Sequence, residues 1–162
     1  MKHVALLTST IAPNQDVYAL QIKDPTERLN QYKKAFSKYL KDLEEGTFDH
    51  IVYVDNSGYS LDELVKLARE SELFNRVEFI SYTSEIDVNN KSRFFLELNL
   101  INYCIANSSI IKSNPDCMIW KITGRYLISN VKDIVSLSKN KKFELCINFR
   151  NYPYKASPYT QA

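Results

Sequence analysis

Short apolar runs and amphipathic stretches alternate from one end of the chain to the other. Five runs are rich in β-branched and aromatic residues, as expected of strands covered on both faces: residues 4–7, 51–54, 77–80, 118–122 and 145–149. Between them, apolar residues at spacings of three and four predict helices: residues 24–46, 60–68, 92–107 and 130–137. This order predicts an α/β fold of Rossmann-like type, a single domain with a mostly parallel sheet of about five strands and helices on both faces.

Local signals mark two helix starts. Residues 24–27 (Asp-Pro-Thr-Glu) supply an N-cap acceptor, a proline at the first helical position and an early glutamate, and Gly46 ends that helix. Residues 60–63 (Ser-Leu-Asp-Glu) have the same capping pattern. Residues 1–150 are expected to form the domain and residues 151–162 a loop or tail. In the third helix, the side chains expected to be buried or partly buried are Phe94, Phe95, Leu98, Ile101, Tyr103 and Ile105.

Composition narrows the class of protein. With 162 residues, 44% of them hydrophobic and 25% charged, the chain is typical of one globular domain. A net charge of +2 is too small to predict a nucleic-acid partner. Cys104, Cys117 and Cys146 lie far apart in apolar contexts and are expected to be free thiols in a reducing compartment. The first apolar run is too short for a signal peptide or a spanning helix, so a cytoplasmic protein without a transmembrane segment is expected.

Ligands of open α/β sheets bind beyond the carboxyl ends of the strands, where strand order reverses. In the segment 118–126 (Met-Ile-Trp-Lys-Ile-Thr-Gly-Arg-Tyr), Lys121 and Arg125 suit an anion such as a diphosphate. Gly124 between them permits a positive φ or a close approach of a ligand to the backbone. The alternative is a surface pair of cations at a helix terminus, or Arg125 stacked on Tyr126.

Asp55 directly follows the second predicted strand, where its carboxylate can accept hydrogen bonds from a ribose or a base N–H. The alternative is that residues 55–58 form a turn whose side chains bond their own backbone.

Several familiar sites are missing from the sequence. It contains no G-x-G-x-x-G, no P-loop and no G-x-S-x-G. It also contains no D-x-D motif, and the pair Glu85 and Asp87 is more typical of a solvated loop than of metal ligands. No metal site is therefore expected. A divalent cation is nevertheless compatible with a diphosphate ligand. His3 and His50 precede their strands and are expected at the opposite edge of the sheet.

Several segments together resemble a group of bacterial glycosyltransferases that assemble capsule and O-antigen polysaccharides and have a GT-A type fold. The resemblance covers about residues 3–155. It is carried by residues 6–11 (Leu-Leu-Thr-Ser-Thr-Ile), 51–57 (Ile-Val-Tyr-Val-Asp-Asn-Ser), 95–98 (Phe-Leu-Glu-Leu) and 120–126 (Trp-Lys-Ile-Thr-Gly-Arg-Tyr) with Asn130. Two departures are residues 88–92, which lack the glycines of the corresponding loop, and the continuation of relatives beyond residues 149–153.

The resemblance implies transfer of a sugar from a nucleotide-diphospho-sugar donor to a glycan or lipid-linked acceptor, and contact with the inner face of a membrane is compatible with it. A homodimer is compatible with the aromatic side chains of Tyr152, Tyr154 and Tyr159. Lys121 and Arg125 would stabilise the diphosphate leaving group without a metal. Glu97 is a candidate catalytic base by its chemistry alone, and a solvated residue otherwise. The residues implied for the nucleotide site are Thr8, Ser9, Thr10, Asp55, Asn56, Ser57, Lys91, Thr123, Gly124 and Tyr126.

Two other functions share this fold class. A sugar nucleotidyltransferase needs a Gly-rich, basic loop after the first strand, and no Gly, Lys or Arg lies between Thr8 and Asp16. The other alternative is a catalytically incomplete domain that binds a nucleotide or a partner protein.

Overall fold

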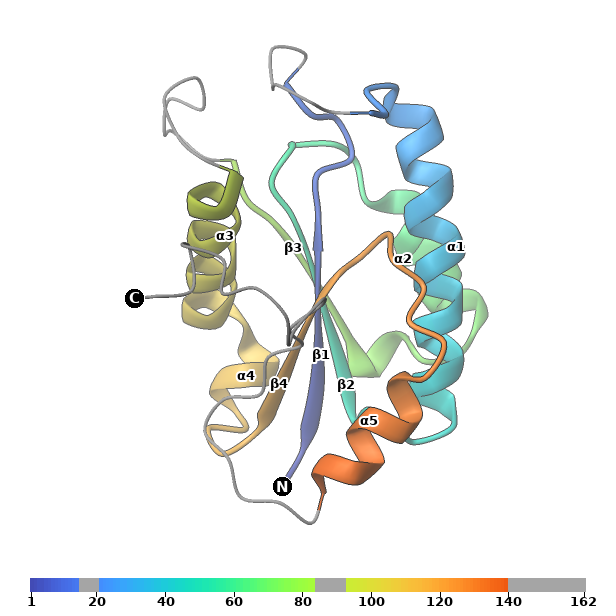
Figure 1. The fold of residues 1–162 in the computed structure, drawn as a ribbon, viewed down its shortest axis with the longest axis vertical. Helices are drawn as coiled ribbons and strands as arrows, with labels where there is room; N and C mark the ends of the chain where they lie inside the picture. The colour runs from blue at the N-terminus through green and yellow to red at the C-terminus, as the bar shows by residue number, and fades with distance from the viewer. Residues whose placement is uncertain (15–20, 84–92, 140–162) are drawn as a thin grey trace, which may run out of the picture.

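The fold is a parallel sheet between two layers of helices (Figure 1). The computed structural model describes residues 1–14, 21–83 and 93–139. Within them, four strands pair in the order β3-β2-β1-β4, every pair parallel: β1 (His3–Ser9), β2 (His50–Asp55), β3 (Val77–Ser81) and β4 (Met118–Thr123). The predicted α/β class with a parallel sheet is therefore confirmed. The described residues contribute four strands rather than five, and the fifth predicted strand, residues 145–149, lies outside them.

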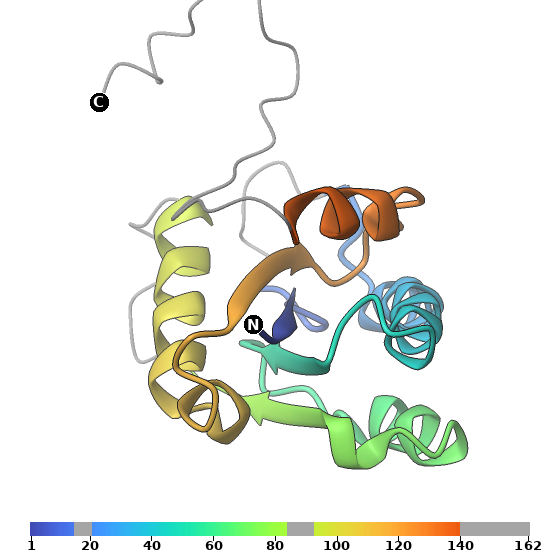
Figure 2. The same ribbon diagram turned by 90° about the horizontal axis from the view of Figure 1, so that it is seen from below.

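Helices cover both faces, as predicted (Figure 2). One face carries α1 (Pro25–Glu44), α2 (Asp62–Glu70) and α5 (Val131–Ser138); the other carries α3 (Arg93–Asn107) and α4 (Ser109–Lys112). The 3-10 turn η1 (Phe74–Arg76) leads into β3. Neither α4 nor η1 was predicted from the sequence, because each is too short to show a periodic apolar stripe.

Strand order reverses between β1 and β4. The chain moves outward from β1 to β2 and β3 with α1 and α2 on one face, then returns through α3 on the other face to place β4 on the far side of β1. Because all four strands are parallel, their carboxyl ends share one edge of the sheet. The β1/β4 junction at that edge is the position where open α/β sheets bind ligands.

The core consists of two apolar clusters, one on each face of β1. Val4 and Leu6 point toward α3 and α4, and Ala5 and Leu7 point toward α1, all fully buried. This explains why the run reads as continuously apolar rather than alternating.

The capping predictions had different outcomes. Asp24 is the N-cap of α1, its Oδ1 accepting the Glu27 amide at 2.7 Å, and Gly46 follows the helix at φ +75°, as predicted. Ser60 is not the N-cap of α2. The N-cap position belongs to Leu61, without a side-chain cap, and Ser60 Oγ instead accepts the Asp62 amide at 3.2 Å.

The predicted buried stripe of α3 was wrong in part. Phe95, Leu98 and Ile105 are exposed, with 41%, 56% and 39% of their surface accessible, whereas Leu100 and Cys104 pack against the sheet. The helix is apolar on more than one side, so periodicity alone could not identify the packed face.

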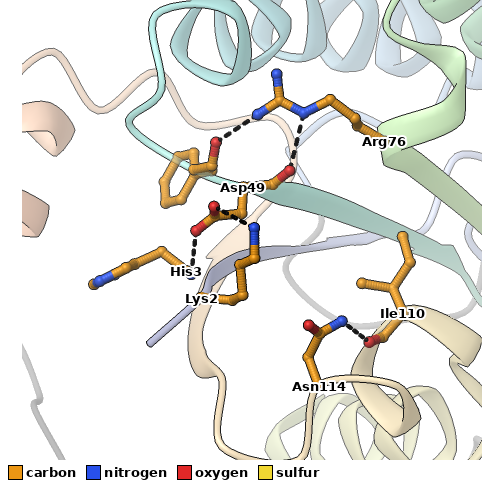
Figure 3. A network of polar contacts seen from close by, with 7 residues as sticks. Lys2, His3, Asp49, Arg76, Ile110 and Asn114 are labelled. Atoms are coloured by element: carbon orange, nitrogen blue, oxygen red, sulfur yellow. Dashed lines mark hydrogen bonds and ion pairs between the residues drawn. The ribbon is translucent and has the colours of Figure 1, made fainter.

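His3 and His50 lie at the amino edge of the sheet, as predicted. The His3 imidazole is stacked on Trp120 and accepts its indole N–H at Nδ1, at 3.0 Å. The His3 amide donates to Asp49 Oδ2 at 2.7 Å, and Lys2 Nζ contacts the other oxygen of Asp49 (Figure 3). His3 must therefore stay neutral at Nδ1 to keep the Trp120 hydrogen bond.

Burial, assisted by Lys139 and opposed by Asp49, lowers the pKa of His3 from 6.5, and burial with Lys2 lowers the pKa of His50. Below about pH 6.5 the unfolded chain then binds more protons than the folded one, so the free energy of unfolding should fall as pH falls through that range. We expect the free energy of unfolding to be lower at about pH 5 than at about pH 7, measured by urea unfolding. His3→Gln, which keeps an acceptor for Trp120, should reduce this slope; an unchanged slope would contradict the role of His3.

Candidate functional site

Hydrogen bonds join most of the predicted site residues that the structure describes into two groups at the carboxyl edge of the sheet, on different sides of β1. Successive residues of a strand point to opposite faces. Thr8 therefore faces α3, whereas Ser9 faces α1 and the end of β2. The first group, named here the Lys121 cluster, consists of Thr8, Glu97, Lys121 and Thr123. The second, the Asp55 network, consists of Ser9, Thr10, Ile11, Ala12, Asp55, Asn56 and Ser57.

The Lys121 cluster spans the β1/β4 junction. Lys121 and Thr123 share one face of β4, and Thr123 is in register with Thr8 of β1. Lys121 Nζ contacts Glu97 Oε1 in a short ion pair and Thr123 Oγ1 at 3.2 Å. Thr8 Oγ1 donates to the same oxygen of Glu97 at 3.3 Å. An ammonium, two hydroxyls and a carboxylate thus meet on one side of the sheet.

The charged side chains of this cluster reach solvent, whereas Thr8 is buried, with 3% of its surface accessible. The side chains of Lys121 and Glu97 are 32% and 36% accessible. A half-exposed ion pair between flexible side chains contributes little to stability, so its partners can exchange for a ligand at small cost. The arrangement suits a ligand with anionic or hydroxyl oxygens.

Asp55 is fully buried, and both of its carboxylate oxygens accept hydrogen bonds from the protein. Oδ2 accepts Ser9 Oγ at 2.7 Å and the Ile11 amide at 3.0 Å; Oδ1 accepts the amide and hydroxyl of Ser57 at 2.7 and 2.5 Å. The contacts with Ser57 match the alternative reading of a turn whose side chain bonds its own backbone. The four hydrogen bonds account for the usual accepting capacity of a carboxylate. Asp55 thus holds two loops together here, and its predicted contact with a nucleoside stays a prediction.

Two more contacts tie the loops after β1 and β2. Ser57 Oγ accepts the Ala12 amide at 3.0 Å, and Thr10 Oγ1 donates to Asn56 Oδ1 at 2.6 Å. Thr10, Asn56 and Ser57 remain half-buried, so they form the rim of the edge rather than its interior.

Arg28 and Tyr32 support this edge and were missed by the sequence analysis. Both are buried on α1. Arg28 Nε donates to the Thr10 carbonyl at 2.8 Å, and Tyr32 OH accepts the Thr10 amide at 3.0 Å. Burial raises the pKa of Tyr32, opposed by the Thr10 amide and by the charge of Arg28. The signal available in the sequence was the position of Arg28 directly beside Leu29, in the apolar stripe of α1. An arginine buried there needs hydrogen-bond acceptors, which the loop after β1 supplies.

Gly124 serves close packing. Its φ is not among the positive values found for glycines of the described residues, at Gly46 and Gly58. Its amide donates to the Thr8 carbonyl at 2.8 Å, and a Cβ at this position would lie 3.0 Å from that carbonyl oxygen and 3.5 Å from the Tyr32 ring. Of the two alternatives considered from the sequence, Gly124 does not adopt the positive φ, and the close approach observed is between protein atoms.

Arg125 and Tyr126 lie in the loop after β4. The guanidinium carbon of Arg125 is 5.3 Å from the ring centroid of Tyr126, the stacking considered as an alternative from the sequence. Among the ion pairs of the described residues, none includes Arg125, and none of their contacts joins it to Lys121. Tyr39 OH donates to the Tyr126 carbonyl at 2.6 Å and anchors the loop to α1.

Lys91, Glu85 and Asp87 lie outside the described residues. Over the described ranges, no group of three or more His, Cys, Asp or Glu side chains could hold a metal ion. In the same part of the chain, no helix has the length and apolarity needed to cross a membrane.

A hollow of about 520 Å³ lies at the opposite, amino edge of the sheet. Its lining includes Lys2 and Asp49, whose side chains pair with each other at 3.1 Å. Because ligands of parallel sheets bind at the carboxyl edge, this hollow is the weaker candidate.

Comparisons of this chain with protein-family models, with curated proteins and with solved structures find no match.

Asp55→Asn should lower the free energy of unfolding by about 2–4 kcal/mol, because the amide turns one donor toward protein donors inside a buried site. Chemical denaturation measures the change. Asp116→Asn, at an exposed position, is the matched control and should change stability by less than about 0.5 kcal/mol. Equal effects of the two substitutions would contradict the compensating role of the Asp55 network.

Gly124→Ala should lower the free energy of unfolding by about 1–3 kcal/mol, because the new methyl group meets backbone at the Thr8 carbonyl. The Thr8 and Gly124 amide resonances should shift in the same variant. A neutral or stabilising effect in thermal unfolding would show that β4 can move away from β1 at this point.

Proposed function

We propose that this chain is a glycosyltransferase domain that binds a nucleotide-diphospho-sugar and transfers the sugar to a growing bacterial surface polysaccharide. The observation that carries the proposal is the Lys121 cluster at the β1/β4 junction. Lys121, Thr8 and Thr123 present one ammonium and two hydroxyl groups where strand order reverses. The resemblance of residues 120–126 to the capsule and O-antigen enzymes gives the substrate class.

The chemistry of such a transfer depends on the leaving group. As the sugar–oxygen bond breaks, negative charge develops on the nucleoside diphosphate, and fixed donors stabilise that charge. Lys121 supplies a point charge and Thr8 and Thr123 supply hydroxyl donors. These groups act through electrostatic stabilisation and hydrogen bonding.

Arg125 adds a second cation on the loop that leaves β4. A guanidinium offers a planar fork of donors that matches two oxygens of one phosphate. Its guanidinium carbon lies over the Tyr126 ring, 5.3 Å from the centroid, and this contact orients the group. A diphosphate bound at this edge engages Lys121 with one phosphate and Arg125 with the other.

The nucleoside then lies toward the ends of β1 and β2. Thr10, Asn56 and Ser57 form the half-buried polar rim there. Asp55 acts as a positioning residue, because its oxygens hold the loops that carry this rim.

A second candidate is a domain that binds a nucleotide or a partner without turnover. It is favoured by the ion pair of Lys121 with Glu97, which neutralises the cation and engages the candidate base. Nucleotide release on incubation with donor and acceptor distinguishes the two, since binding without transfer or hydrolysis supports the second.

Lys121→Gln and Arg125→Gln should each weaken binding of a UDP- or GDP-sugar by about tenfold or more, because each removes a charged hydrogen bond to phosphate. Titration followed by backbone NMR shifts near Asn56 and Gly124 measures the affinity. Lys66→Gln, exposed on α2, is the matched control and should have no effect.

A CMP-sugar, which has a single phosphate, should depend on only one of the two cations. Equal affinities for wild type and both variants, or the absence of any shift at the carboxyl edge, would overturn the proposed function.

A further inference from the structure

We infer that the Glu97 carboxylate is a built-in competitor for the anion site, so that a phosphate binds at Lys121 only by displacing it. This inference rests on the proposed function and adds a regulation of the same site. It follows from the contacts of one oxygen atom, Glu97 Oε1.

Oε1 of Glu97 accepts from two donors that belong to neighbouring strands. Lys121 Nζ reaches it from β4, and Thr8 Oγ1 reaches it from β1 at 3.3 Å. An ammonium and a hydroxyl converging on one anionic oxygen is also the arrangement that binds a phosphate oxygen. The carboxylate therefore occupies the donors that the proposed ligand requires.

The pair is built so that it can open. Glu97 belongs to α3, whereas both of its donors belong to the sheet, so the contact is made by side chains of different layers. Both charged side chains are about one third accessible. Exposed ion pairs of this kind are weak, and a doubly charged ligand displaces a single carboxylate from a shared cation.

Displacement leaves the carboxylate close to the bound phosphate. The negative charges of the Glu97 carboxylate and of a neighbouring phosphate repel each other, even at a site that is partly accessible to solvent. Glu97 thus lowers anion affinity in two ways, by holding Lys121 and Thr8 beforehand and by repelling the ligand afterwards. This competition makes the site selective for a diphosphate. A small anion that displaces Glu97 gains only the contact with Lys121, whereas a diphosphate also gains a contact with Arg125.

The test uses inorganic pyrophosphate and the full chain, with affinity measured by calorimetric titration. Glu97→Gln keeps the shape and an acceptor for Thr8 and should raise pyrophosphate affinity about tenfold. The gain should disappear in the double variant Glu97→Gln/Lys121→Gln, because the competition acts through Lys121.

Glu63→Gln is the matched control. Glu63 also pairs with a lysine, Lys33 at 2.5 Å, but between α1 and α2, and its substitution should leave pyrophosphate affinity unchanged. A similar gain from Glu63→Gln would reduce the effect to net charge and overturn the inference.

The other outcomes separate the two proposals. Unchanged or weaker binding by Glu97→Gln, while Lys121→Gln still weakens binding, overturns the competition and leaves the anion site in place. A gain that persists without Lys121 also overturns it. No binding of pyrophosphate or of a nucleotide-sugar by wild type or by Glu97→Gln overturns both proposals.

Discussion

The carboxylate of Asp55 is a full charge withdrawn from solvent, and the geometry of the carboxyl edge follows from the need to compensate it. An ionised carboxylate in an apolar interior is unstable unless its oxygens accept hydrogen bonds. Ser9, Ile11 and Ser57 supply four of them. To deliver the Ile11 amide, the chain after β1 must turn across the end of β2. The direction of that loop is therefore set by one buried charge.

Strand alternation then places the two hydroxyl groups at the end of β1 on opposite faces of the sheet. The Ser9 hydroxyl donates to Asp55 and so helps to compensate the buried carboxylate. Thr8 points to the opposite face, where its hydroxyl donates to Glu97. Gly124 holds the junction from the other side, because its amide bonds the Thr8 carbonyl and its missing Cβ lets the backbone approach. The end of β1 is thus fixed from β2 and from β4 at once. A hydroxyl on so rigid a strand end can be presented to a ligand with little loss of conformational entropy.

Much of this arrangement was predictable from sequence, and the limits have physical causes. The alternation of apolar runs and apolar stripes predicted the order of strands and helices. The N-cap at Asp24 was also predictable, because a cap depends only on residues adjacent in sequence. The presence of Thr8, Thr123 and Lys121 at one edge of the sheet followed from the rule for carboxyl ends, whereas their meeting in one cluster was not predicted, since Thr8 was assigned to the nucleoside and Lys121 to the diphosphate. The pairing of Glu97 with Lys121 was not predicted either, because the placement of α3 against β1 and β2 depends on packing between segments far apart in sequence. For the same reason, the sequence did not show which apolar side of α3 is exposed to solvent.

Lys121 and Arg125 also show why nearness in sequence is a poor guide to shared function. Four positions apart, they were expected to act on one anion as a pair. Lys121 still belongs to β4, so its side is set by the pleat toward α3, whereas Arg125 follows Gly124 into a loop anchored to α1 through Tyr39. The cations therefore approach the edge from different sides. On the proposed function, a ligand must extend across the end of β4 to meet both, and this requirement favours a diphosphate over a single phosphate.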